Sequence, residues 1–158
     1  MRNVYLDTTI PSLLATTKDD PASATRREIT QAFWRWYPGR CRLFVSDIVV
    51  AELRAGAWPG REEALAAVAD LTRLPVTDPV EAAAREYLRA LVVPVTAGRD
   101  ALHLACACVH GMQVLLTWNV RHLANPERTA RLAGLNRRLG LATPAVRTPG
   151  SLLEGIDA

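Results

Sequence analysis

The sequence predicts an α/β fold in which helices cover a central, mainly parallel sheet of four to five strands. Short apolar runs rich in β-branched and aromatic residues alternate with longer amphipathic segments along the whole chain. No repeat, low-complexity tract or linker interrupts this alternation. Because a single domain commonly takes roughly 100–200 residues, the 158 residues are expected to form one domain, residues 1–158.

Five short segments are expected to be strands, the last of them at an edge of the sheet. They cover residues 3–7, 42–46, 73–76, 113–117 and 145–149. Helices between consecutive strands favour parallel pairing, and the ligands of parallel α/β sheets bind beyond the carboxyl ends of the strands. The residues that follow the first, second and fourth segments are therefore the candidates for a functional site.

Six longer segments are expected to be helices. They cover residues 21–37, 47–56, 61–72, 77–92, 98–111 and 125–140. Ser46 or Asp47 can cap the second of these helices. In the fourth, Asp78 can be the N-cap, Pro79 fits the first helical position and Glu81 can complete a capping box.

Composition is typical of a globular protein that works in a reducing compartment. Hydrophobic residues make up 49% and charged residues 22%, proportions that exclude a disordered chain. The cysteines have no disulfide-framework spacing, and no targeting segment or membrane-spanning run is found, so a cytoplasmic location is expected. The net charge of +3 and the arginine-rich basic set, with Lys18 the only lysine, permit nucleic acid as a partner. Ordinary solvated helix faces explain the same excess.

Three carboxylates come from distant parts of the chain but fall where such a sheet places chemistry. Asp7 ends the first strand, and the threonines beside it could cap the next helix in its place. Glu52 lies in an apolar helical segment, where an unpaired carboxylate costs several kcal/mol. A salt bridge or an edge position that reaches solvent is the alternative for Glu52. Asp100 starts a helix, where an acidic residue also suits the helix dipole.

Polar side chains near these acids complete the candidate site. Thr117 ends the fourth strand and Asn119 follows it, where Asn119 can serve either as a neutral oxygen ligand or as a helix cap. His103 lies one turn beyond the third carboxylate and is expected to make an orienting hydrogen bond. A zinc site of His103, Cys106 and His110 is not expected, since three ligands on one straight helix do not converge on a tetrahedral ion.

The ordered set of segments resembles the PIN-domain family and, within it, the VapC-type toxins of toxin–antitoxin pairs. The resemblance is carried by VYLDTTIPSLL, VSDIVVAEL, GRDALHLACA, VLLTWNVRHLAN and, near the end, RTPGSLL. It covers essentially the whole chain in the right order. It implies a PIN-like α/β/α sandwich whose acidic residues bind Mg²⁺ or Mn²⁺ and cleave RNA.

The resemblance also implies the site. Asp7, Glu52 and Asp100 match the first three acids of the family, and Thr9 matches the small hydroxyl residue two places after the first acid. The fourth position, commonly aspartate, is Asn119 here, which leaves the number of bound metal ions open. The first and third acids are expected to bind metal directly, and Glu52 and Asn119 directly or through water.

Reaction and partners follow from the same resemblance. RNA is expected to be hydrolysed by a metal-activated water, leaving a 3′-hydroxyl and a 5′-phosphate. Their places in the sequence, and not the resemblance, lead us to expect that Thr117 and His103 support the site and that Arg99 and Arg121, which flank it, contact phosphates. The implied partners are a cognate antitoxin protein and a second copy of the chain in a homodimer.

Other classes of protein fit the sequence less well. A catalytically weakened PIN-like binding or assembly protein is the main alternative, because Asn119 removes one acid. A phosphatase of the haloacid-dehalogenase type is disfavoured because Thr9 stands where it needs a second aspartate. A nucleotide-binding module is disfavoured because neither GxGxxG nor GxxxxGK[ST] is present.

Overall fold

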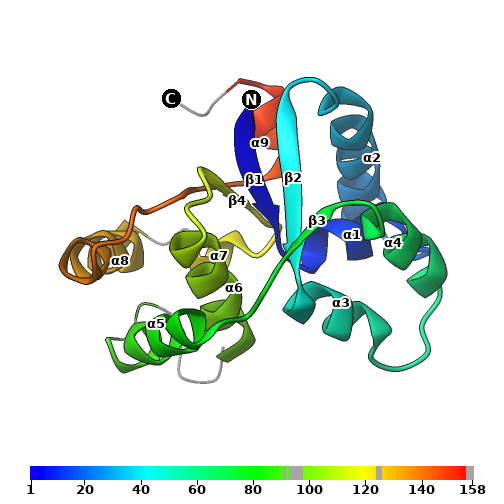
Figure 1. The fold of residues 1–158 in the computed structure, drawn as a ribbon. Coiled ribbons are helices and arrows are strands. Elements are labelled where there is room, and N and C mark those ends of the chain that lie inside the picture. Colours follow the sequence, from blue (N-terminus) through cyan, green and yellow to red (C-terminus); the bar gives the residue numbers. More distant parts are fainter. Residues whose placement is uncertain (91, 93–97, 124–125, 156–158) are drawn as a thin grey trace.

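The computed structural model describes residues 1–90, 92, 98–123 and 126–155, which form one parallel sheet between two layers of helices (Figure 1). The strand order is β3-β2-β1-β4-β5, with every neighbouring pair parallel. The strands are β1 (Arg2–Leu6), β2 (Cys41–Ser46), β3 (Thr72–Leu74), β4 (Val114–Leu116) and β5 (Ala145–Arg147). The expected α/β sandwich is confirmed, including the edge position of the last strand.

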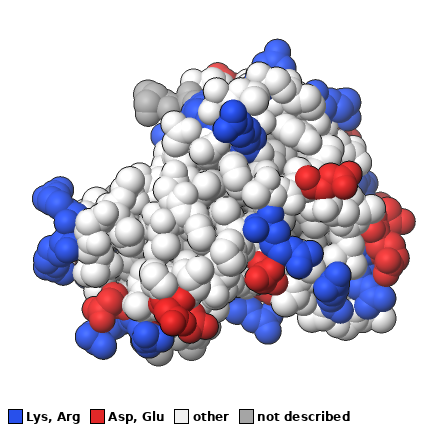
Figure 2. Space-filling view, viewed as in Figure 1, with Lys and Arg blue, Asp and Glu red and all other residues white. Residues whose placement is uncertain are grey.

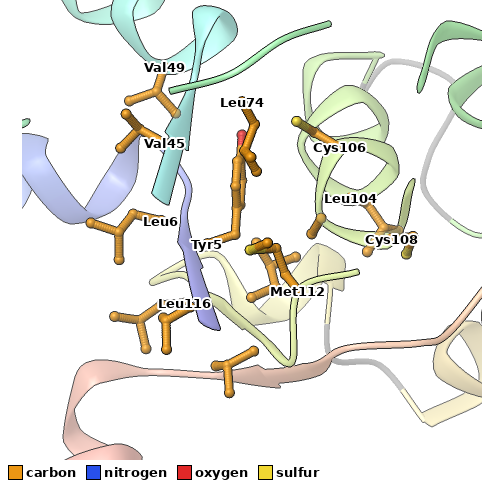
Figure 3. Packing of buried hydrophobic residues seen from close by; sticks show 14 of the residues in the cluster. Tyr5, Leu6, Val45, Val49, Leu74, Leu104, Cys106, Cys108, Met112 and Leu116 are labelled. Atoms are coloured by element: carbon orange, nitrogen blue, oxygen red, sulfur yellow. The ribbon is translucent and has the colours of Figure 1, made fainter. Parts of the chain in front are cut away.

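The central strand β1 is buried on both faces. Val4, Tyr5 and Leu6 have no exposed surface, and their partners across the sheet in β4 are buried as well. Such a continuous apolar run is typical of a parallel strand covered by helices on both sides. Figure 3 shows Tyr5 pointing to the side of Cys106 and Leu6 to the side of Leu116, as strand alternation requires.

The helices of the described residues include all six that the sequence predicts. They are α1 (Thr9–Leu14), α2 (Pro21–Trp36), α3 (Asp47–Arg54), α4 (Arg61–Val68), α5 (Asp78–Arg89), α6 (Gly98–Val109), α7 (Val120–Leu123), α8 (Pro126–Leu139) and α9 (Pro149–Leu153). In Figure 1, α1, α2 and α4 lie on one side of the sheet, and α5, α6 and α8 on the other. None of these helices is long and apolar enough to cross a membrane.

Two helix starts test the expected caps. Ser46 is the N-cap of α3, and its hydroxyl accepts a hydrogen bond from the backbone N–H of Val49 at 3.4 Å. The capping box predicted for α5 is wrong. Its N-cap is Thr77, which makes no side-chain cap hydrogen bond, and Asp78 already lies inside the helix. Proline suits the whole first turn because its φ is fixed, so Pro79 does not mark the first helical residue.

The carboxyl ends of β1 and β4 meet at one edge of the sheet, the lower edge in Figure 1. The backbone N–H of Asp7 donates to the carbonyl of Leu116 at 3.2 Å, and that of Thr117 donates to the carbonyl of Arg147 at 3.0 Å. These bonds continue the sheet by one residue beyond the strands. They fix the backbone from which the side chains of Asp7 and Thr117 project.

Candidate active site

Asp7 is a buried carboxylate at this edge, with only 2% of its surface exposed. One oxygen, Oδ1, accepts hydrogen bonds from the backbone N–H of Thr9 at 3.0 Å and from its hydroxyl at 2.5 Å. The other, Oδ2, accepts from the hydroxyl of Thr117 at 2.5 Å. Burial raises the pKa of Asp7 above its usual value of 3.8, although His103 and the two threonines oppose the shift. An ionised Asp7 would therefore be stabilised by a cation.

A chain of hydrogen bonds joins Asp7 to Asp100. The Thr117 hydroxyl that donates to Asp7 accepts from the backbone N–H of Asn119 at 2.8 Å. The side-chain amide of Asn119 then donates through Nδ2 to Oδ2 of Asp100 at 3.1 Å. The chain links residues that follow β1 and β4 to the first turn of α6. Two carboxylates about 4 Å apart repel by about 4 kcal/mol at an effective dielectric near 20, so an amide donor at 119 avoids that repulsion.

Glu52 projects from α3 and is compensated by three groups. Its Oε1 accepts from the hydroxyl of Thr8 at 2.7 Å and from Nε2 of His103 at 2.6 Å. Nη1 of Arg99 lies 3.6 Å from Oε2. Burial opposes ionisation of Glu52, but His103, Thr8 and Arg99 together hold its pKa below the usual 4.5. The salt bridge of Glu52 is therefore not with Arg54 or another neighbour on its own helix, the alternative that the sequence allows, but with Arg99 and His103 of α6.

Behind Glu52, His103 is fixed by two buried hydroxyl groups. Its Nδ1 lies 2.6 Å from the Tyr5 hydroxyl, which lies 2.8 Å from Oγ of Ser46. When Nε2 donates to Glu52, Nδ1 of the neutral ring accepts from Tyr5, and the Tyr5 oxygen can accept from Ser46. The hydrogen bond expected of His103 is therefore present. We call the hydrogen-bonded series His103, Tyr5 and Ser46, which leads from Glu52 into the core, the relay.

Sequence analysis missed Tyr5, Ser46 and Thr8 as members of the site. Tyr5 could have been suspected, because a phenol in a buried aliphatic strand needs a hydrogen-bond partner. Ser46 was noticed only as a cap, yet its hydroxyl serves both the cap and Tyr5. The sequence around Thr8 gives no sign that its hydroxyl bonds Glu52, which is 44 residues away.

The remaining candidates divide into those the structure places and those it leaves undescribed. Arg99 is exposed and pairs with Glu52, whereas the side chain of Arg121 lies outside the described residues. His110 does not join His103, since its Nε2 bonds the carbonyl of Pro75 at 2.9 Å. Within the described part of the chain, no three His, Cys, Asp or Glu side chains are grouped so that they could hold a metal ion.

The donor chemistry nevertheless fits a hard divalent cation when amide and hydroxyl oxygens are included. Asp7, Asp100 and Asn119 offer carboxylate and amide oxygens, the ligands that Mg²⁺ and Mn²⁺ prefer. Burial disfavours the charge on Asp7, and a bound cation would reverse that effect.

Comparison with known proteins places the chain in a family. Residues 4–126 match the sequence model of the PIN domain family, and the chain belongs to that family. The family expected from the motifs is thereby confirmed. No curated protein matches the chain.

Solved structures of toxin–antitoxin proteins share the fold. The sarcin–ricin-loop-cleaving toxin VapC20 of Mycobacterium tuberculosis is 22% identical, with a TM-score of 0.53 over 71% of this chain and 86% of that chain. VapBC2 from Rickettsia felis, bound to a DNA fragment from its promoter, is 14% identical, with a TM-score of 0.60 over 92% of this chain and 98% of that chain. FitAcB from Neisseria gonorrhoeae is 18% identical, with a TM-score of 0.56 over 92% of this chain and 97% of that chain. At these identities the likeness establishes the fold.

Proposed function

We propose that this PIN-domain protein is a metal-dependent endoribonuclease and acts as the toxin of a toxin–antitoxin pair. The observation that carries the proposal is the hydrogen-bonded chain from Asp7 through Thr117 and Asn119 to Asp100. It gathers hard oxygen donors where parallel sheets bind ligands. Membership of the PIN domain family supports the same chemistry.

In the proposed reaction, Asp7 and Asp100 bind Mg²⁺ or Mn²⁺ directly, and Asn119 binds through its amide oxygen or through water. When bound, the metal supplies an activated water and neutralises charge on the scissile phosphate. Thr9 and Thr117 hold both oxygens of Asp7, so its carboxylate cannot rotate away from the ion. Preorganised ligands of this kind lower the cost of assembling the reactive geometry.

Glu52 has a different proposed part. Thr8 and His103 donate to one of its oxygens and Arg99 lies near the other, and from this position Glu52 would contact a bound metal directly or through water. His103 is a positioning residue that holds Glu52. The pairing of Arg99 with Glu52 places a cation beside the site, where it can contact a phosphate once RNA arrives.

Partners and location belong to the same proposal. The structures of VapBC2 and FitAcB support a cognate antitoxin as a protein partner, and we propose that the active chain forms a homodimer. The three cysteines are free and buried, which suits a reducing cytoplasm.

The proposal is tested with purified protein and a panel of structured RNAs, with Mn²⁺ or with EDTA. Asp7→Asn and Asp100→Asn are expected to abolish cleavage while the fold survives. Asp47→Asn is a matched control, because Asp47 also follows a strand at this edge but is 55% exposed and pairs with Arg73. Full activity in either of the first two variants, or undiminished cleavage in EDTA, would reject the proposal.

A second candidate is a PIN-like protein that has lost catalysis and serves in binding or assembly. Asn119 favours it, since one acid of the usual set is missing. The two candidates differ in metal binding: a working site takes up Mn²⁺, and Asp7→Asn weakens that uptake. Tight, Asp7-dependent binding of Mn²⁺ would remove the main reason for the second candidate.

A further inference from the structure

A cavity beside the candidate active site contains cationic and aromatic groups that the proposed metal chemistry does not use. It has a volume of about 620 Å³ and is lined by residues of α1, the start of α2 and the end of α3, among them Thr8 and Glu52 of the site. Figure 1 shows these elements on one side of the sheet. We call it the α1 cavity. Its volume is within the range of small-ligand sites, roughly 300–1,000 Å³.

Two cations, Lys18 and Arg26, line the α1 cavity. The guanidinium of Arg26 lies over the Trp118 ring, 5.5 Å from its centroid. That ring is fixed, because its Nε1 donates to the hydroxyl of Thr30 at 3.0 Å. A guanidinium stacked in this way keeps its N–H edges for a bidentate contact with an anion such as phosphate. Trp118 also adjoins the site, since its backbone N–H donates to the Thr9 hydroxyl at 2.9 Å.

The loop that carries Lys18 is held by Arg27. Nη1 of Arg27 donates to the carbonyls of Thr16 and Lys18 at 3.0 and 3.1 Å. The Lys18 backbone N–H also donates to the Thr16 hydroxyl at 3.3 Å. The backbone of this loop is therefore fixed beside the cavity that Lys18 lines.

Trp58 supplies an aromatic wall of the same cavity. Its Nε1 donates to the carbonyl of Leu53 at 2.9 Å, so the ring has a fixed orientation. The turn that follows is pressed against α1: a Cβ on Gly60 would lie 2.2 Å from the carbonyl oxygen of Ala15. A fixed, half-buried indole is a surface on which any nucleobase can stack.

The face shown in Figure 2 has no continuous basic patch, because acidic and basic side chains are interspersed on it. On this face, attraction of RNA would depend on individually placed cations more than on a broad field.

We propose that the α1 cavity binds one unpaired nucleotide of the RNA strand beside the bond that is cut. Its phosphates lie between Lys18 and Arg26, and its base stacks on Trp58. The inference rests on the proposed ribonuclease function and assigns its substrate subsite. It commits the enzyme to single-stranded segments, because a base that is paired in a helix cannot reach the Trp58 ring.

The test measures binding in EDTA, so that it does not depend on metal or cleavage. The probe is a short fluorescein-labelled oligouridylate, and its binding to the protein is measured by fluorescence anisotropy at several salt concentrations. Lys18→Gln and Arg26→Gln are each expected to weaken binding about tenfold and to lower the salt slope by about 0.7. Trp58→Leu is expected to weaken binding by at least about fivefold with little change of slope.

Arg35→Gln is the matched control, because Arg35 is an exposed arginine on α2 that does not line the cavity. Thermal unfolding of every variant separates lost binding from lost fold, and neither Lys18→Gln nor Arg26→Gln is expected to unfold the protein at the temperature of the binding assay. Wild-type affinity in Lys18→Gln and Arg26→Gln overturns the inference. So does equal loss in Arg35→Gln, or equal affinity for a matched duplex.

This design separates the two proposals. If the expected binding pattern appears but Mn²⁺ supports no cleavage, the ribonuclease proposal fails and the nucleotide site remains. If Mn²⁺-dependent cleavage appears but the α1 cavity variants bind and cleave like wild type, the ribonuclease proposal remains and the inference fails.

Discussion

The relay behind Glu52 gives the sharpest mutational prediction, Tyr5→Phe. Tyr5 has no exposed surface, and its hydroxyl contacts two buried partners, Ser46 at 2.8 Å and His103 at 2.6 Å. Removing one partner of a buried hydrogen bond costs about 1–3 kcal/mol. With two partners affected, we expect a loss of about 3 kcal/mol in the free energy of unfolding, which lowers Tm by roughly 6–12 °C.

Tyr87→Phe is the matched control for this change. Tyr87 is equally buried, and its hydroxyl donates to Oδ1 of Asn136 at 2.6 Å and also contacts the Cys108 thiol, away from the candidate site. We expect it to lose about 1–2 kcal/mol and to keep the RNA cleavage rate. Tyr5→Phe should also slow cleavage, because His103 no longer holds Glu52 firmly.

Urea unfolding followed by circular dichroism measures both stabilities, and Mn²⁺-dependent cleavage of RNA measures the second effect. An unfolding midpoint for Tyr5→Phe equal to that of wild type would refute the relay. Equal cleavage rates for the two variants would refute its link to the active site.

Three further predictions test other parts of the account. Burial raises the pKa of Asp7, so the contribution of this residue to stability is complete below pH 3.8 and is lost as pH rises through the raised pKa. Metal-free Asp7→Asn should therefore gain stability relative to wild type as pH rises from 3.8, which urea unfolding at a series of pH values measures. Asn119→Asp replaces an amide donor 3.1 Å from Asp100 with a carboxylate, so the substitution should destabilise the metal-free protein by up to about 4 kcal/mol and should make Mn²⁺ raise Tm more than in wild type. An unchanged Tm of the metal-free variant would contradict this prediction. Gly60→Ala should lower the free energy of unfolding by more than about 2 kcal/mol, because φ is +92° and the new Cβ meets Ala15, whereas Gly39→Ala, with φ of +80° and open space, should lower it by about 1 kcal/mol. Equal changes of Tm in the two variants would count against the close approach of Gly60 and Ala15.

Much of the fold follows from the sequence because the spacing of apolar residues and the residues that end a helix or strand are local features of the chain. The apolar run before Asp7 predicts a buried strand, and the position of Asp7 at its end predicts a side chain at the sheet edge. The start of α5 was misplaced by one residue, since Pro79 is compatible with more than one position in the first turn.

The candidate site was predictable only in part because spacing along a chain does not say which helix face meets which strand. Asp7, Asp100 and Asn119 were chosen from strand ends and helix starts, and whether they hold a metal stays a prediction. The bonds from Tyr5 to His103 and from Thr8 to Glu52 span 98 and 44 residues. Contacts of that kind depend on the packing of α3 and α6 against β1, which no local pattern records.

The central claim is that Asp7 belongs to a centre that binds a divalent cation. Isothermal titration of the purified chain with Mn²⁺ tests it most directly, with Asp7→Asn and Asp47→Asn measured in parallel. The account predicts saturable uptake by wild type and Asp47→Asn and a large loss in Asp7→Asn. Absence of binding to wild type, or the same affinity in all three proteins, would contradict it.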